Sequence, residues 1–183
     1  MAKFFILFVV ILVSLFAVEL TPAMQNAVVI PWTEGLVRIS AGLITTVDSQ
    51  VAVFGKILQS TRNGFAISIE AGCNGIEAAI MLIAAMLAFP APWKHRVIGI
   101  VAGLIAVQTL NVVRVISLFY LGQWSVQAFI WAHLYVWQAL IMLDVLIVWL
   151  IWIRALPRAA TMVSSPPALP VMAEAGKTAT ASS

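Results

Sequence analysis

Four apolar segments constrain this sequence more than any other feature, because each is close to the length that crosses a bilayer. A membrane-spanning helix needs about 20 mainly apolar residues. The chain of 183 residues is 63% hydrophobic and 9% charged, a composition that excludes a water-soluble domain of this size. The sequence therefore predicts an all-α integral membrane protein with about four transmembrane helices. We expect these at residues 4–20, 75–89, 97–121 and 133–153.

The basic residues predict how these helices are oriented. Positive charge in short connections marks the cytoplasmic side, and five basic residues share one side in an N-in, C-in arrangement: Lys3, Lys94, Arg96, Arg154 and Arg158. The net charge of +3 is therefore interpreted as membrane topology rather than nucleic-acid binding. An alternative for the first segment is a cleaved signal peptide, which leaves the orientation of the other helices unchanged.

This orientation divides the chain into four parts. Residues 1–20 form the first transmembrane helix, and residues 21–72 form an outward segment on the periplasmic side. Residues 73–154 form a three-helix membrane core. Residues 155–183 are rich in Ala, Ser, Thr and Pro, which predicts a disordered cytoplasmic tail.

The outward segment carries two periodic patterns. Apolar residues recur at three-, four- and seven-residue spacing, which predicts an amphipathic helix against the membrane or over the bundle; they are Leu36, Leu43, Val47, Val51, Phe54 and Leu58. Further on, Phe65, Ile67 and Ile69 alternate with smaller or polar residues, which predicts a short strand directly before the cysteine.

Cys73 is the only cysteine of the chain, and it lies between the predicted strand and a predicted helix, flanked by Gly72 and Gly75. Unpaired N–H groups at a helix N-terminus favour an anion, so the pKa of this thiol is expected to fall. The glycines would let a substrate backbone approach closely. The alternative is a small cysteine that packs like an alanine.

Arg114 and His133 map to the same membrane level as Cys73. Arg114 lies 18 residues after Arg96, which is about 27 Å of helix and places it near the outer edge of the hydrocarbon. His133 begins the last span after two interfacial tryptophans. A thiol, a guanidinium and an imidazole at one interface form the residue set of a cysteine acyl-transfer site. Each also has a structural alternative: a salt bridge from Arg114 to Glu70, Glu77 or Asp144, and a merely interfacial His133.

Three further residues are candidates for a supporting role. Asn74 follows the cysteine, and Glu77 lies one turn further on, where it could hold Arg114, tune the thiol or simply begin the helix. Asn111 lies one turn from Arg114 on nearly the same helix face, where it could orient the guanidinium. Asp144 is costly inside a membrane helix and needs a partner, with Asn111 or a hydroxyl residue as possible choices.

The Gly-Cys-Asn-Gly turn, the Asn-x-x-Arg of the next span and the His that opens the last one resemble the exosortase/archaeosortase family, and the small size is most similar to exosortase H. The resemblance covers residues 21–154, with its motifs between Cys73 and His133. Asn74 departs from the serine that commonly follows the cysteine in this family.

The resemblance implies a multi-pass cysteine transpeptidase of the bacterial cytoplasmic membrane with its site facing the periplasm. Its substrates would be exported proteins with a C-terminal sorting signal, here of the Ile-Pro-Thr-Leu type, followed by a transmembrane helix. The cleaved protein would pass through a thioester to a membrane-embedded acceptor, such as a lipid-linked one. The expected catalytic residues are Cys73, Arg114 and His133.

Two other functions fit the same residues. In a non-enzymatic scaffold or transporter subunit, Cys73 would be a packing residue and the charged residues would join the helices. An intramembrane hydrolase would use the same site without transfer. We expect no cofactor, no metal and no nucleic-acid partner, since one cysteine and one outward histidine provide too few ligands for a metal site.

Overall fold

The fold is known from a computed structural model, which describes residues 2–156. The predicted cytoplasmic tail from residue 157 onward, including Arg158, lies outside the described residues. The described chain is mostly helical, as the sequence predicted, and also contains one small sheet.

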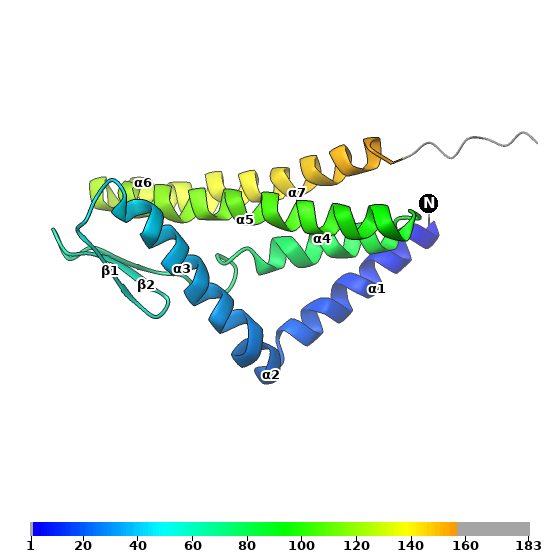
Figure 1. Cartoon of the computed structure of the whole chain (residues 1–183), viewed down its shortest axis with the longest axis horizontal. Coiled ribbons are helices and arrows are strands. Elements are labelled where there is room, and N and C mark those ends of the chain that lie inside the picture. The colour runs from blue at the N-terminus through cyan, green and yellow to red at the C-terminus, as the bar shows by residue number, and fades with distance from the viewer. Residues whose placement is uncertain (1, 157–183) are drawn as a thin grey trace, which may run out of the picture.

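The helical bundle has four main members (Figure 1). The helix α1 (Ala2–Glu19) packs on α4 (Ile76–Ala88), and α4 packs on α5 (Trp93–Trp124). A continuous helix then runs from α6 (Val126–Trp131) through the π-helical turn η2 (Ala132–Val136) into α7 (Trp137–Arg154), which packs on both α4 and α5.

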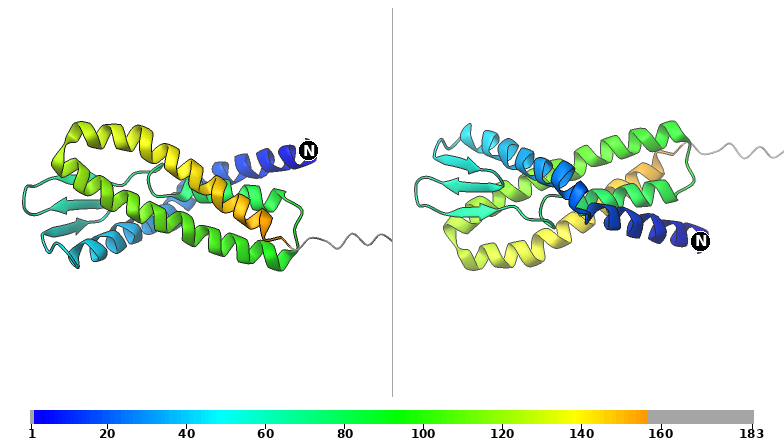
Figure 2. Two further views of the ribbon diagram at one scale, coloured as in Figure 1. Left: turned by 90° about the horizontal axis from the view of Figure 1, so that it is seen from above. Right: turned by 90° about the horizontal axis from the view of Figure 1, so that it is seen from below.

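The outward segment extends beyond this bundle. A short α2 (Pro22–Met24) and a π-helical turn η1 (Gln25–Val29) lead into α3 (Ile30–Thr45), and Figure 1 shows α1 and α3 meeting at α2 in a V. Three antiparallel strands follow in the order β1-β2-β3. They are β1 (Val51–Phe54), β2 (Ile57–Ser60) and β3 (Ala66–Ser68), which lie at the end of the molecule reached by α3 (Figure 2).

The predicted amphipathic helix is correct only in its first half. Leu36 is buried and Arg38 exposed, as predicted, but Leu43 of the predicted apolar face is 51% exposed, and Ile44 is buried in its place. The extension to Leu58 is wrong, because the chain forms the β1–β2 hairpin there. The Asp48 carboxylate accepts the Gln50 N–H, and such a turn after a helix competes with its continuation. The β-branched residues that follow favour a strand.

The strand expected before the cysteine is confirmed as β3. It is one of the three strands in the described residues, and β1 and β2 are not expected from the sequence. The sheet packs with α3 and α5 around an outer core, which is made by buried residues of α3, β2 and α5: Val37, Leu58, Val115 and Phe119.

Within residues 2–156, four helices are long and apolar enough to cross a membrane, but they differ in part from the predicted set. They are Ala2–Glu19, Pro22–Thr45, Trp93–Trp124 and Val126–Arg154. The predicted span at 75–89 corresponds to α4, which has only 13 residues, about 20 Å of helix. The segment Pro22–Thr45, assigned above to the outward part, meets the criteria of length and composition instead.

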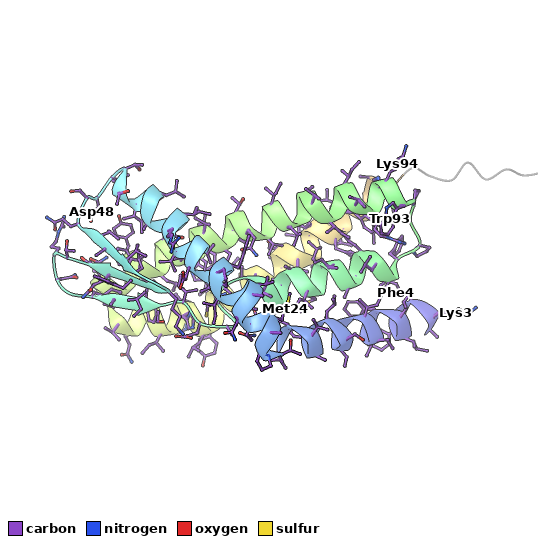
Figure 3. The ribbon with its side chains drawn as sticks, turned by 60° about the horizontal axis from the view of Figure 1, so that its bottom comes forward. Lys3, Phe4, Met24, Asp48, Trp93 and Lys94 are labelled. Atoms are coloured by element: carbon purple, nitrogen blue, oxygen red, sulfur yellow. The ribbon has the colours of Figure 1, made fainter. Side chains whose placement is uncertain are left out.

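Charged residues lie at both ends of the structure, and the end that carries Asp48 also carries Arg62, whose guanidinium lies 3.8 Å from the Asp48 carboxylate. Lys3 and Lys94 lie at one end and Asp48 at the other (Figure 3). At the end with Lys3 and Lys94, the Trp152 indole donates to the His95 carbonyl oxygen at 3.2 Å, which fixes α7 against the start of α5. With 32 residues, α5 is about 48 Å long, so it extends beyond a hydrocarbon layer of about 30 Å.

Candidate active site

A tight turn connects β3 to α4 and carries Cys73. The Cys73 N–H donates to the Glu70 carbonyl oxygen at 3.0 Å, and Gly72 has φ +85°, a left-handed conformation that favours glycine. The Glu77 carboxylate accepts the Gly72 N–H. Glu77 therefore holds the turn in place, and it forms no ion pair with Arg114 among residues 2–156.

Asn74 anchors this turn to two helices. Its side chain is 0% exposed, donates to the Thr33 hydroxyl on α3 at 3.0 Å and accepts the Ile76 N–H at the start of α4 at 3.1 Å. The Trp32 indole also donates to the Asn74 carbonyl oxygen, at 3.3 Å. An asparagine amide can donate to the Thr33 hydroxyl and accept the Ile76 N–H at the same time, which gives a physical reason for asparagine at this position.

We therefore expect Asn74→Ala to destabilise the protein by about 1–3 kcal/mol, because the Ile76 N–H loses its acceptor and a buried polar bridge is lost. The measurement is thermal unfolding in detergent. Thr33→Val removes only the α3 contact and should cost less. In the double variant the two losses of unfolding free energy should not add, because both substitutions remove the same hydrogen bond between Asn74 and Thr33. Full additivity would contradict this bridge.

The three predicted catalytic side chains meet at one sulfur atom. The Arg114 Nη2 atom lies 3.5 Å from the Cys73 Sγ, and the His133 Nε2 atom lies 3.8 Å from the same atom. Arg114 is only 3% exposed. Among the described residues it has no carboxylate partner, and Glu70 pairs with Lys56 instead. The salt-bridge alternative for Arg114 is therefore not observed.

His133 reaches the sulfur from a distorted helix. It lies in the π-helical turn η2, and such single turns are frequent at functional sites. The Phe129 ring stacks on the imidazole with centroids 5.6 Å apart and an interplanar angle of 3°. The Nδ1 atom of His133 is buried and has no hydrogen-bond partner in the described chain. Phe129, which the sequence analysis did not select, thus sets the plane of the ring.

Asn111 lies beside the site but does not hydrogen-bond Arg114. It is 0% exposed, and both of its amide atoms lack a partner within residues 2–156. A Cβ atom on Gly75, whose φ is +76°, would lie 3.0 Å from the Asn111 Nδ2 atom, so a glycine is required for this close approach. The Asp144 Oδ2 atom also has no hydrogen-bond partner among residues 2–156. Asn111 is therefore not the partner of Asp144 that the sequence suggested.

The expected fall in the pKa of Cys73 is wrong in its net direction. Burial raises the pKa of this thiol, the Arg114 charge lowers it by a smaller amount, and Glu77 and Glu70 add to the rise. The helix α4 begins only at Ile76, three residues after Cys73, so the thiol is not in its first turn, where the helix dipole acts most strongly.

Alkylation of Cys73 by iodoacetamide should therefore reach its half-maximal rate at a higher pH than alkylation of a free cysteine, because only the thiolate reacts. In Arg114→Ala the midpoint should move higher still, since the charge that favours the thiolate is removed. The single cysteine lets the rate be read by mass spectrometry. A midpoint below that of free cysteine would contradict this assignment.

Comparison with known proteins agrees with the resemblance inferred from the motifs. The family model of the transmembrane exosortases matches residues 1–152, most of the chain and all three residues around the sulfur. Comparison with curated proteins and with solved structures gives no significant match. A multi-pass helical bundle, a cysteine contacted by an arginine and a histidine, and this match lead to one conclusion: the chain belongs to the transmembrane exosortase family.

Proposed function

We propose that this protein is a membrane cysteine transpeptidase that cleaves the C-terminal sorting signals of exported proteins and transfers them to an acceptor. One observation carries the proposal: Arg114 at 3.5 Å and His133 at 3.8 Å share the sulfur of the only cysteine. An arginine and a histidine that converge on a thiol, with no carboxylate among residues 2–156 to pair the arginine, suit acyl transfer better than packing.

Each side chain has a distinct role in this reaction. Cys73 attacks the scissile carbonyl carbon, and His133 takes the thiol proton through Nε2. Arg114 stabilises the negative charge on the carbonyl oxygen, in place of backbone donors. His133 then returns the proton to the leaving amine as the C–N bond breaks, which leaves a thioester on Cys73. An acceptor nucleophile attacks the thioester carbonyl carbon and loses its proton to His133, the C–S bond breaks, and His133 passes the proton to the departing thiolate, which regenerates the thiol.

A neutral resting thiol fits this sequence of steps. Because burial raises the pKa of Cys73, the mechanism needs His133 as the base that takes the thiol proton. The stacked Phe129 holds the imidazole for both transfers. Of the family members, exosortase H remains the proposed subgroup, with a signal of the Ile-Pro-Thr-Leu type as substrate.

The proposed setting is the bacterial cytoplasmic membrane with the site on the periplasmic side. Supporting this, Cys73 precedes α4 and Lys94 follows it, so the site and Lys94 lie at opposite ends of that helix, and basic ends of short loops remain in the cytoplasm. The acceptor would then be reached from the outer leaflet, which suits a lipid-linked nucleophile.

The test is processing of a co-expressed protein that ends in a sorting signal, a transmembrane helix and a basic cluster. We expect a shortened product only when this protein is present, with a mass that includes an acceptor. A product ending in a free carboxylate would indicate the hydrolase. No shortened product, with both proteins in the membrane, would favour the scaffold.

A further inference from the structure

The sheet that leads to Cys73 has an unpaired edge. On either side of β3, the backbone groups of Phe65 and Ile69 face β2, because the Ser60 N–H donates to the Phe65 carbonyl oxygen at 2.8 Å and the Ile69 N–H to the Lys56 carbonyl oxygen at 3.0 Å. The backbone groups of a strand alternate in direction. Those of Ala66 and Ser68 therefore point to the other side, where no described strand lies.

This edge is open as well as unpaired. Ala66, Ser68 and Glu70 are all exposed, as are the next two residues of the turn. No hydrogen bond joins the N–H or carbonyl group of Ala66 or Ser68 to another described residue outside the β2–β3 pair. An exposed edge with free donors and acceptors is a template for one more strand.

The edge also runs directly to the candidate nucleophile. From Ser68 to Glu70 the extended chain advances about 7 Å, and the turn that follows keeps the Glu70 and Cys73 Cα atoms within about 7 Å of each other. A chain paired with Ser68 would therefore need about four residues to place a carbonyl group at the Cys73 sulfur.

We propose that the β3 edge binds the substrate polypeptide as an added antiparallel or parallel strand, and that this pairing delivers the scissile peptide to Cys73. The inference rests on the proposed function. The occupant is an extended polypeptide, since alternating N–H and carbonyl groups at strand spacing match another strand and not a lipid chain. The backbone of Ala66 and Ser68 makes the contacts, so the edge accepts varied side chains, and specificity arises nearer to Cys73.

Disulfide cross-linking tests the pairing directly. In a Cys73→Ser background the chain has no cysteine, so Ala66→Cys and Ser68→Cys each introduce the only thiol. Each variant is oxidised in membranes together with a set of sorting-signal substrates. Each substrate carries one cysteine, and its position moves by one residue from one substrate to the next. We expect each of the two variants to form a disulfide best with one substrate position. The best positions for Ala66→Cys and Ser68→Cys should be two residues apart, and the one that links to Ser68→Cys should lie about four residues from the scissile bond.

Gln59→Cys is the matched control, because Gln59 lies opposite Ala66 on the same face but on the middle strand. It should link at least about tenfold less, since a paired strand separates it from the substrate. Equal linking at all substrate positions, or best linking from Gln59, would overturn the proposal.

Proline substitution gives a second test, with activity as the readout. Ser68→Pro and Ala66→Pro each remove an outward N–H and leave the β2–β3 bonds intact, so processing should fall at least about tenfold. Val51→Pro is the control on the far edge of the sheet, where Gln50 rather than Val51 bonds to β2, and it should stay within about twofold. Wild-type processing by both edge variants would exclude edge pairing.

These outcomes separate the two proposals. If Cys73→Ser abolishes processing while cross-links and proline variants show no edge effect, the transpeptidase assignment stands and the edge is not the binding site. If Cys73→Ser leaves processing unchanged, the proposed function fails whatever the edge variants do.

Discussion

Cys73→Ser is expected to lower processing of a sorting-signal substrate by more than about 10³, to below detection in cells. A serine hydroxyl at this position has the same neighbours but a far higher pKa than a thiol. His133 at 3.8 Å would have to remove a much less acidic proton. The measurement is the fraction of substrate shortened at matched expression, with the variant's thermal unfolding compared with that of the wild type.

The packing alternative predicts a different pattern for this position. A small packing residue tolerates both Cys73→Ser and Cys73→Ala, so both variants would process substrate as the wild type does. In the nucleophile assignment neither variant is active, although both fold. Activity in Cys73→Ala would therefore reject the enzymatic role of this residue.

Arg114→Ala is expected to lower processing by about 10²–10³, the usual cost of removing one donor to a developing oxyanion. Arg114 is 3% exposed and its Nη2 atom lies 3.5 Å from the sulfur, so water cannot easily replace the guanidinium. Arg114→Lys should also be impaired, because a lysine keeps the charge but lacks the planar fork.

The control for this loss is Arg38→Ala. Arg38 is also a helical arginine, but its side chain is 71% exposed and pairs with Glu34 on the surface of α3, so its loss should change processing by less than about twofold. Equal effects of the two substitutions would indicate a general charge requirement. Undiminished processing by Arg114→Ala would remove this residue from the mechanism.

The sequence predicted which residues form the candidate site because membrane depth can be counted. Helix rise from Arg96 gives the level of Arg114, and flanking tryptophans give that of His133. Counting cannot give the rotation of a helix about its axis. That Arg114 faces Cys73 depends on how α5 packs on α4, and that His133 does so depends on the π-helical turn η2, for which the sequence carries no clear signal.

The missed hairpin had a weak local signal. Asp48 with Gln50 forms a side-chain turn, and Gly55 has φ +58° between β1 and β2. These turn signals are weaker than the spacing of the apolar residues, which fits one long helix as well as, in part, a helix followed by two short strands. The anchoring of Asn74 by Thr33 and Trp32 was also beyond reach, since those contacts join residues about 40 positions apart.

The most direct test of the account is to run the reaction with hydroxylamine as an added nucleophile. A thioester on Cys73 reacts with hydroxylamine, so the released substrate should carry a C-terminal hydroxamate, identified by mass spectrometry, in an amount that rises with hydroxylamine concentration. Cys73→Ser should give none. A shortened product that never contains the hydroxamate, at any hydroxylamine concentration, would contradict a covalent intermediate on Cys73.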